Sequence, residues 1–168
     1  MPELIRFEVE RMPARKLVGR EIRQKMGSDE NPIPAFWQRC FADGTFQVIE
    51  ALGAPALDGS YVGFMCDYQA DEGMFTYICG IFMKPDCAVP EGFVGRDVPE
   101  SDVAVGWVRG PEFENYPVAH NLTAAAMEKA GRRPDEAASW CAEVYNCPRF
   151  TTPQENGDVI LDYHIPCL

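Results

Sequence analysis

Residues 61–85 read YVGFMCDYQADEGMFTYICGIFMKP, and this stretch has the pattern of a β-hairpin. Two apolar and aromatic runs, 61–68 and 74–83, flank a polar turn at 71–73. Runs of this length that are rich in aromatic and β-branched residues, and are bounded by turn residues, are typical of strands. Pro85 ends the second run, because proline cannot donate a hydrogen bond to a sheet.

The segment before the hairpin predicts a strand and an amphipathic helix. Strand-like runs at 4–9 and 15–22 are separated by Met12 and Pro13, which we interpret as a kink or bulge in one long first strand. A helix follows the proline-containing entrance at 31–34, and a second short helical turn is expected at 46–52. The apolar residues at helical spacing are Ile33, Phe36, Trp37, Cys40 and Phe41.

The second part of the chain repeats this order. A strand at 102–109 precedes a helical pattern from Tyr116 to Ala130, and strands are predicted at 140–146 and 158–165. Pro166 ends the last strand as Pro85 ends the hairpin, and the two prolines are 81 residues apart, close to half of the chain. This spacing indicates an internal duplication.

The predicted fold class is therefore α+β, with tandem duplicated βαββ units and a ligand crevice between the halves. We expect one domain over residues 1–168, with a first half at about 1–85, a bridge at about 86–101 and a second half at about 102–168. A helix covers one face of each unit, so the other face must be buried or functional.

One acidic residue interrupts the apolar strand at 140–145. Cys141, Glu143 and Tyr145 share one face of this strand, because successive side chains alternate. A carboxylate beside an aromatic ring suits a lipophilic cation or a reaction that needs one general base, whereas on a solvated face it has no special role. The predicted ligand-binding residues are Glu143, Tyr145, Trp107, Tyr68, Trp37 and Tyr77.

The charge of the chain limits its partners. Its 168 residues include 15 basic and 26 acidic residues, for a net charge of −11. Such a field repels phosphate backbones, favours cationic partners and also aids solubility. We therefore expect a hydrophobic or cationic small molecule as the partner, with no direct nucleic-acid binding. No apolar stretch of 18 residues occurs, so no membrane span is expected.

The cysteines and histidines do not have metal-site spacing. None of the seven cysteines forms a C-x-x-C pair, and several lie in apolar runs, which favours buried reduced thiols and a cytoplasmic location. His120 and His164 are far apart in sequence and lie in no ligand pattern. No P-loop, Rossmann glycine pattern or nucleophile elbow occurs, so neither a cofactor nor a metal is expected.

Several segments, in this order, resemble the GyrI-like small-molecule-binding domain, which is also the effector-binding part of AraC-type and MerR-type multidrug regulators. The matching segments are 12–19, the hairpin runs 61–68 and 74–83, the linker 89–92, the strand with its Gly-Pro end at 105–111, and the closing hairpin at 143–145 and 159–166. The resemblance implies a tandem βαββ, SHS2-like pocket in which an acidic residue at the place of Glu143 pairs with cationic aromatic ligands.

The resemblance leaves three functions open. The favoured one is a stand-alone binding domain, because the pocket domain uses the whole 168-residue chain and leaves no segment for the helix-turn-helix of the regulators. The second is a hydrolase of strained or electrophilic small molecules, similar to relatives that open cyclopropane toxins, with Glu143 as general base. The third is an acidic protein-interaction module similar to the gyrase-inhibitory relative, which would add a protein partner.

Overall fold

The computed structural model describes all residues 1–168. The chain folds into two compact units. One unit, here called the central unit, comprises Pro13–Pro99. The other, here called the terminal unit, combines Met1–Met12 with Glu100–Leu168. Each unit contains four antiparallel strands, here called the central sheet and the terminal sheet, and a pair of helices, so the predicted α+β class is confirmed.

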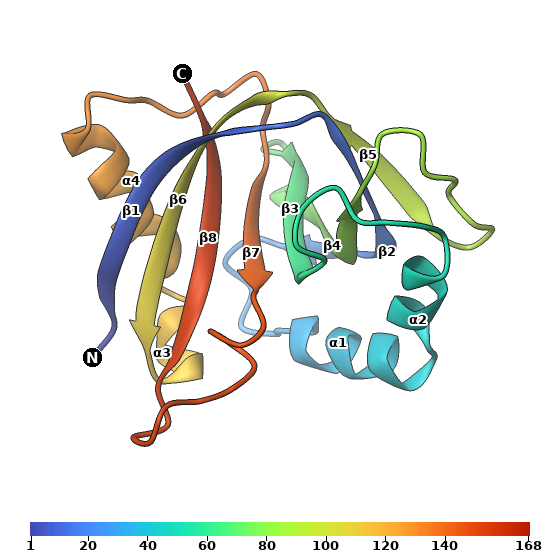
Figure 1. Ribbon diagram of the computed structural model, residues 1–168, viewed down its shortest axis with the longest axis horizontal. Coiled ribbons are helices and arrows are strands. Elements are labelled where there is room, and N and C mark those ends of the chain that lie inside the picture. The colour runs from blue at the N-terminus through green and yellow to red at the C-terminus, as the bar shows by residue number, and fades with distance from the viewer. The chain divides into compact units, whose positions relative to one another are not determined.

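The central unit begins with strand β2 and contains the hairpin from which the fold was predicted (Figure 1). Its strand order is β3-β4-β2-β5, and each neighbouring pair is antiparallel. The elements are β2 (Arg15–Lys25), α1 (Ile33–Ala42), α2 (Thr45–Glu50), β3 (Tyr61–Gln69), β4 (Met74–Met83) and β5 (Val94–Val98).

The predicted apolar stripe of α1 faces the core at Phe36 and Cys40, whereas Phe41, also in the stripe, is exposed. Phe36 and Cys40 of α1, with Phe46 and Ile49 of α2, pack with residues of β4 in one core cluster. Each is 5% exposed or less, so removal of their apolar surface from water stabilises the helix pair on the sheet.

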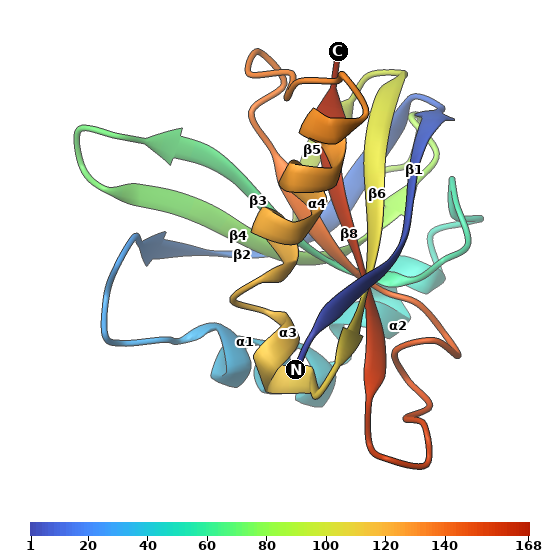
Figure 2. The ribbon, with the colours of Figure 1, turned by 90° about the vertical axis from the view of Figure 1, so that its left-hand side faces the viewer.

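The terminal unit has the strand order β1-β6-β8-β7, again antiparallel throughout. Helix α4 packs against β1, β6 and β8, and Figure 2 shows it running along this sheet. The elements are β1 (Glu3–Met12), β6 (Ser101–Gly110), α3 (Glu112–Asn115), α4 (Ala119–Lys129), β7 (Cys141–Tyr145) and β8 (Val159–Cys167).

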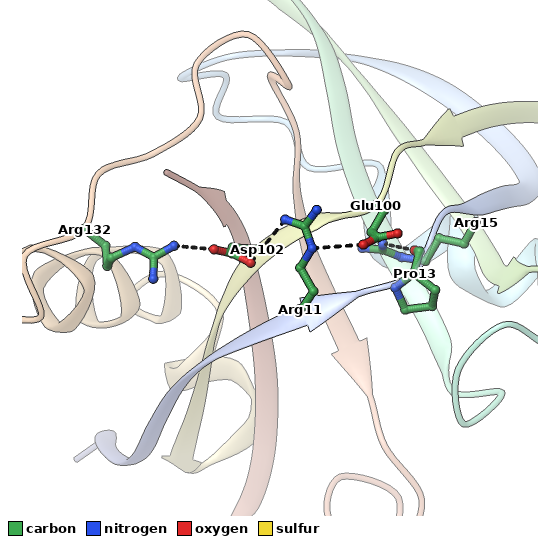
Figure 3. Close-up of polar contacts among 6 residues, drawn as sticks. All are labelled: Arg11, Pro13, Arg15, Glu100, Asp102 and Arg132. Carbon is green, nitrogen blue, oxygen red and sulfur yellow. Dashed lines mark hydrogen bonds and ion pairs between the residues drawn. The ribbon is translucent and has the colours of Figure 1, made fainter.

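A chain of ion pairs at one end of the terminal unit joins β1, β6 and the segment after α4 (Figure 3). Arg11 of β1 contacts Glu100 at 3.1 Å and Asp102 at 3.3 Å, and Arg132 contacts Asp102 at 2.6 Å. The hydrogen bonds from Arg132 and then Arg11 lower the pKa of Asp102. Because these groups are solvated, the ion pairs contribute little to the free energy of folding and mainly hold the three segments in register.

Both units follow the predicted order of strand, helices and hairpin, and each also has a fourth strand that was not predicted. The opening strand β2 pairs with β5, whereas the opening strand β6 pairs with β1. The prediction of a single long first strand is wrong, because this segment forms two strands, β1 and β2, that pair with different partners. The predicted bridge at 86–101 contains β5, and β8 continues through Pro166 to Cys167.

All seven cysteines are free thiols, as predicted. Five are buried, and Cys40 and Cys79 belong to the core cluster of the central unit. In these positions they act as small hydrophobic side chains.

Candidate functional site

Glu143 lies on the helix-covered face of the terminal sheet. In the register of this sheet, Tyr163 of β8 pairs with Glu143 on one side and with Gly106 of β6 on the other. A side chain at Gly106 would collide with Thr123 of α4, and the Tyr163 hydroxyl is 3.0 Å from Nδ1 of His120, also in α4. Paired residues point to the same side of a sheet, so Glu143 shares the α4 side.

The Glu143 carboxylate is bordered by aromatic rings. The Tyr145 hydroxyl donates a hydrogen bond of 2.9 Å to Glu143 Oε1. The Tyr145 ring lies edge-on to Phe150, with centroids 4.8 Å apart, and to Tyr116, with centroids 6.5 Å apart. We call these four residues the Glu143 aromatic cluster. All four are half-buried, so the carboxylate is partly desolvated yet reachable.

The charge of Glu143 acts on its aromatic neighbours. The pKa of Tyr116 is raised above its usual range, first by burial and then by the negative charges of Glu112 and Glu143. Tyr116 therefore stays neutral, with its ring next to a negative charge. A carboxylate in a cluster of neutral aromatic rings attracts organic cations, because the ion pair and the cation–π attraction can act together.

His120 and Tyr163 form a second polar pair beside the cluster. Their rings meet edge-on with centroids 5.4 Å apart, in addition to their hydrogen bond. Desolvation of the imidazole lowers the pKa of His120. The neutral form of His120 is favoured, so the pair adds no positive charge beside Glu143 near neutral pH.

Trp107 does not share the face of Glu143, in contrast to the predicted arrangement. It pairs with Asp162, the neighbour of Tyr163 in β8, and so points to the opposite side of the terminal sheet. There its indole is covered by the guanidinium of Arg149 at 3.9 Å and by that of Arg6 at 4.5 Å. Arg149 also binds the Asp162 carboxylate through two nitrogens, at 3.1 and 2.6 Å.

The other three predicted aromatic residues belong to the central unit. Trp37 Nε1 donates a hydrogen bond of 3.0 Å to the Tyr77 hydroxyl, which joins α1 to β4. The Trp37 ring also stacks on Phe46, with centroids 5.6 Å apart. Tyr68 lies apart from this pair. It is exposed near the β3–β4 turn, where it stacks on Phe75.

A small depression in the central unit also contains a carboxylate. Its volume is about 220 Å³, and the Glu50 carboxylate at its edge accepts a hydrogen bond of 3.2 Å from Tyr61. The lining residues are Glu50, Gly53, Pro55, Gly59, Ile81 and Met83. Unlike Glu143, Glu50 is exposed, so solvent screens its charge more strongly.

Two members of the Glu143 aromatic cluster were not predicted as site residues. Tyr116 fits a helical stripe in the sequence, although it lies at the junction of α3 and α4. Phe150 lies in the segment between β7 and β8, which has no periodic pattern. The helical stripe therefore indicated that Tyr116 faces the sheet, but not that it contacts Tyr145.

No group of three or more His, Cys, Asp or Glu side chains is arranged to hold a metal ion. The helices are also too short or too polar to span a bilayer.

Comparison with known proteins identifies the family. Residues 8–167 match the model of Cass2, described as an integron-associated effector binding protein. The chain belongs to this family. The resemblance to the GyrI-like small-molecule-binding domain is thereby confirmed. Among curated proteins, no significant match was found.

Several solved structures have the same fold. SAV2435 bound to tetraphenylphosphonium has a TM-score of 0.74 at 15% identity, over 98% of this chain and 94% of that chain. A Staphylococcus aureus MU50 protein described as a bacterial transcription regulator has a TM-score of 0.70 at 15% identity, over 96% and 97%. An integron cassette protein from Vibrio cholerae has a TM-score of 0.58 at 14% identity, over 99% of both chains.

Proposed function

We propose that this protein binds lipophilic aromatic cations and that the Glu143 aromatic cluster supplies the binding site. Membership of an effector-binding family establishes small-molecule binding as the general function. The nature of the ligand is inferred from the cluster itself. The observation that carries the proposal is the half-buried Glu143 carboxylate, oriented by the Tyr145 hydroxyl at 2.9 Å and bordered by aromatic rings.

The chemistry of the cluster favours a diffuse cation over a compact one. A small hydrated ammonium would have to give up its water for a site whose walls are largely rings. A cation whose charge is spread over aryl groups gives up little hydration and gains contact with Tyr116, Tyr145 and Phe150. The relative SAV2435, which was solved with tetraphenylphosphonium, binds a ligand of this class.

The proposal is tested by calorimetric titration with tetraphenylphosphonium and with neutral triphenylphosphine oxide. Glu143→Gln keeps the shape of the side chain and removes its charge. We expect the affinity for the cation to fall about 10- to 100-fold, which corresponds to roughly 1.4 to 2.8 kcal/mol. The affinity for the neutral compound should change by less than about threefold, because the rings remain.

Two control variants separate the site from general charge and general aromatic effects. Glu128→Gln removes an equal charge from the exposed side of α4. Trp107→Phe alters an aromatic residue on the opposite face of the terminal sheet. Both should bind the cation as the wild type does. Equal affinity of wild type and Glu143→Gln for tetraphenylphosphonium would refute the role of Glu143.

Binding without turnover is expected. The Tyr145 hydroxyl fixes the orientation of the Glu143 carboxylate, which suits a charge partner. Incubation with activated aryl esters and strained cyclopropanes, followed by mass spectrometry, should find no product that depends on Glu143. Several equivalents of hydrolysed product per protein, absent for Glu143→Gln, would favour the hydrolase instead.

A further inference from the structure

We propose that Glu112 is a second charge partner, which makes the Glu143 aromatic cluster selective for flat aromatic dications over monocations of the same size. This inference rests on the proposed function and specifies its ligand class. It assigns a specificity role to the short helix α3, which no sequence motif indicated.

The first step is that α3 is held firmly. The side chain of Asn115, its last residue, is fully buried. Its Nδ2 donates to the carbonyl of Gly110 at 3.1 Å and to that of Val159 at 3.3 Å. These bonds join α3 to the ends of β6 and β8, so the residues of α3 keep a fixed position relative to the terminal sheet.

The second step is the spacing of Glu112 and Tyr116. Tyr116 directly follows α3 and has helical backbone angles, φ −57° and ψ −47°. Residues four apart on a helix lie on the same side, one turn from each other. Glu112 is therefore on the side of Tyr116, and the Tyr116 ring meets that of Tyr145, which bonds Glu143. The other acidic residue of α3, Glu114, is exposed.

The third step is electrostatic. After burial, which has the largest effect, Glu112 and Glu143 both raise the pKa of Tyr116, so the charges of both carboxylates act on one phenol. Each is half-buried, so their mutual repulsion is screened less than it would be in bulk water. A monocation compensates one of these charges. A dication of the same size compensates both and also contacts the aromatic rings of the cluster.

The test uses three planar two-ring probes of nearly equal size. They are methyl viologen with two charges, 1-methyl-4-phenylpyridinium with one, and neutral 4-phenylpyridine, titrated at one fixed ionic strength near pH 7.5. The variants are Glu112→Gln, Glu143→Gln and, as the matched control on the same helix, Glu114→Gln. Thermal unfolding of each variant verifies that it is folded.

We expect wild type to bind the dication most tightly. Glu112→Gln should lower the affinity for the dication about fivefold and that for the monocation less than about twofold. Glu143→Gln should lower both, and Glu114→Gln neither. This inference alone would be overturned if Glu112→Gln lowered the affinities for monocation and dication equally, or lowered neither. It would also be overturned if the wild type showed no preference for the dication. Monocation binding that is insensitive to Glu143→Gln would instead overturn the proposed function.

Discussion

The central unit and the terminal unit each contain an equivalent hydrogen bond between a tyrosine of the sheet and a helix. In each, a tyrosine on the second strand of the hairpin bonds through its hydroxyl to a ring nitrogen on the unit's own helix. Tyr77 bonds Trp37 of α1, and Tyr163 bonds His120 of α4, each at 3.0 Å. The two units thus share both the order of elements and a polar contact between helix and sheet.

The residues that pair with that tyrosine on the two neighbouring strands differ between the units. In the central unit Tyr77 pairs with Ile22 and Met65, which are apolar and pack against the core cluster. In the terminal unit Tyr163 pairs with Gly106 and Glu143. The same backbone position therefore contributes core packing in one unit and a charge in the other. The comparison teaches that two units with the same order of elements can differ in function through a few residues on one helix-covered face.

The largest expected effect concerns Gly106. A Cβ atom there would lie 2.3 Å from Thr123 Oγ1 and 2.9 Å from a methyl group of Leu4. We expect Gly106→Ala to lower the free energy of unfolding by about 1 to 3 kcal/mol, measured by urea denaturation, because the helix and β1 must move. Adding Thr123→Ala should recover part of the loss. Full stability of Gly106→Ala would show that α4 is not packed closely on β6.

The second prediction compares the two tyrosine–carboxylate pairs. Tyr145→Phe removes the hydroxyl that orients Glu143 and keeps the ring. It should weaken tetraphenylphosphonium binding by about 0.5 to 1.5 kcal/mol. Tyr61→Phe removes the corresponding bond to the exposed Glu50 and should leave this binding unchanged. If Tyr61→Phe had the larger effect, the binding role would belong to the central unit.

The smallest expected effect is the pH dependence of the His120–Tyr163 contact. Because the pKa of His120 is lowered in the folded protein, the unfolded chain binds more protons below the ordinary histidine pKa of about 6.5. Stability from this residue is therefore fully present above that pH and is lost as the pH falls through it. Urea denaturation at pH 5.5 and 7.5 should show a smaller difference for His120→Asn than for wild type, by less than about 1 kcal/mol. An unchanged difference would mean that the folded environment does not disfavour the charged imidazole.

The local elements were predictable because their signals are local. The helix at Ile33–Ala42 follows from its apolar spacing, and the hairpin follows from two apolar runs around a polar turn. The pairing of β1 was not predictable, because its residues pair with β6 residues about 90 to 105 positions away. The two strand-like runs beside Pro13 also fit one bent strand. Proline there ends one strand, and the chain starts another with different partners.

The site was predictable only within a single strand. Alternation places Glu143 and Tyr145 on one face of β7, and their hydrogen bond agrees with this. The relative face of Trp107 depends on the registers between β6, β8 and β7, which the sequence does not contain. Tyr116 and Phe150 come to Tyr145 from a helix junction and a loop, so only the folded chain reveals them as neighbours.

The most direct test of the central claim is a crystal structure of the protein with tetraphenylarsonium, whose arsenic atom can be located by its anomalous scattering. We predict an arsenic peak within about 6 Å of the Tyr116 or Tyr145 ring centroid and beside the Glu143 carboxylate, with aryl groups against the rings. The peak should disappear in Glu143→Gln crystals soaked in the same way. An arsenic site beside Glu50 in the central unit, with none at the Glu143 aromatic cluster, would contradict the account.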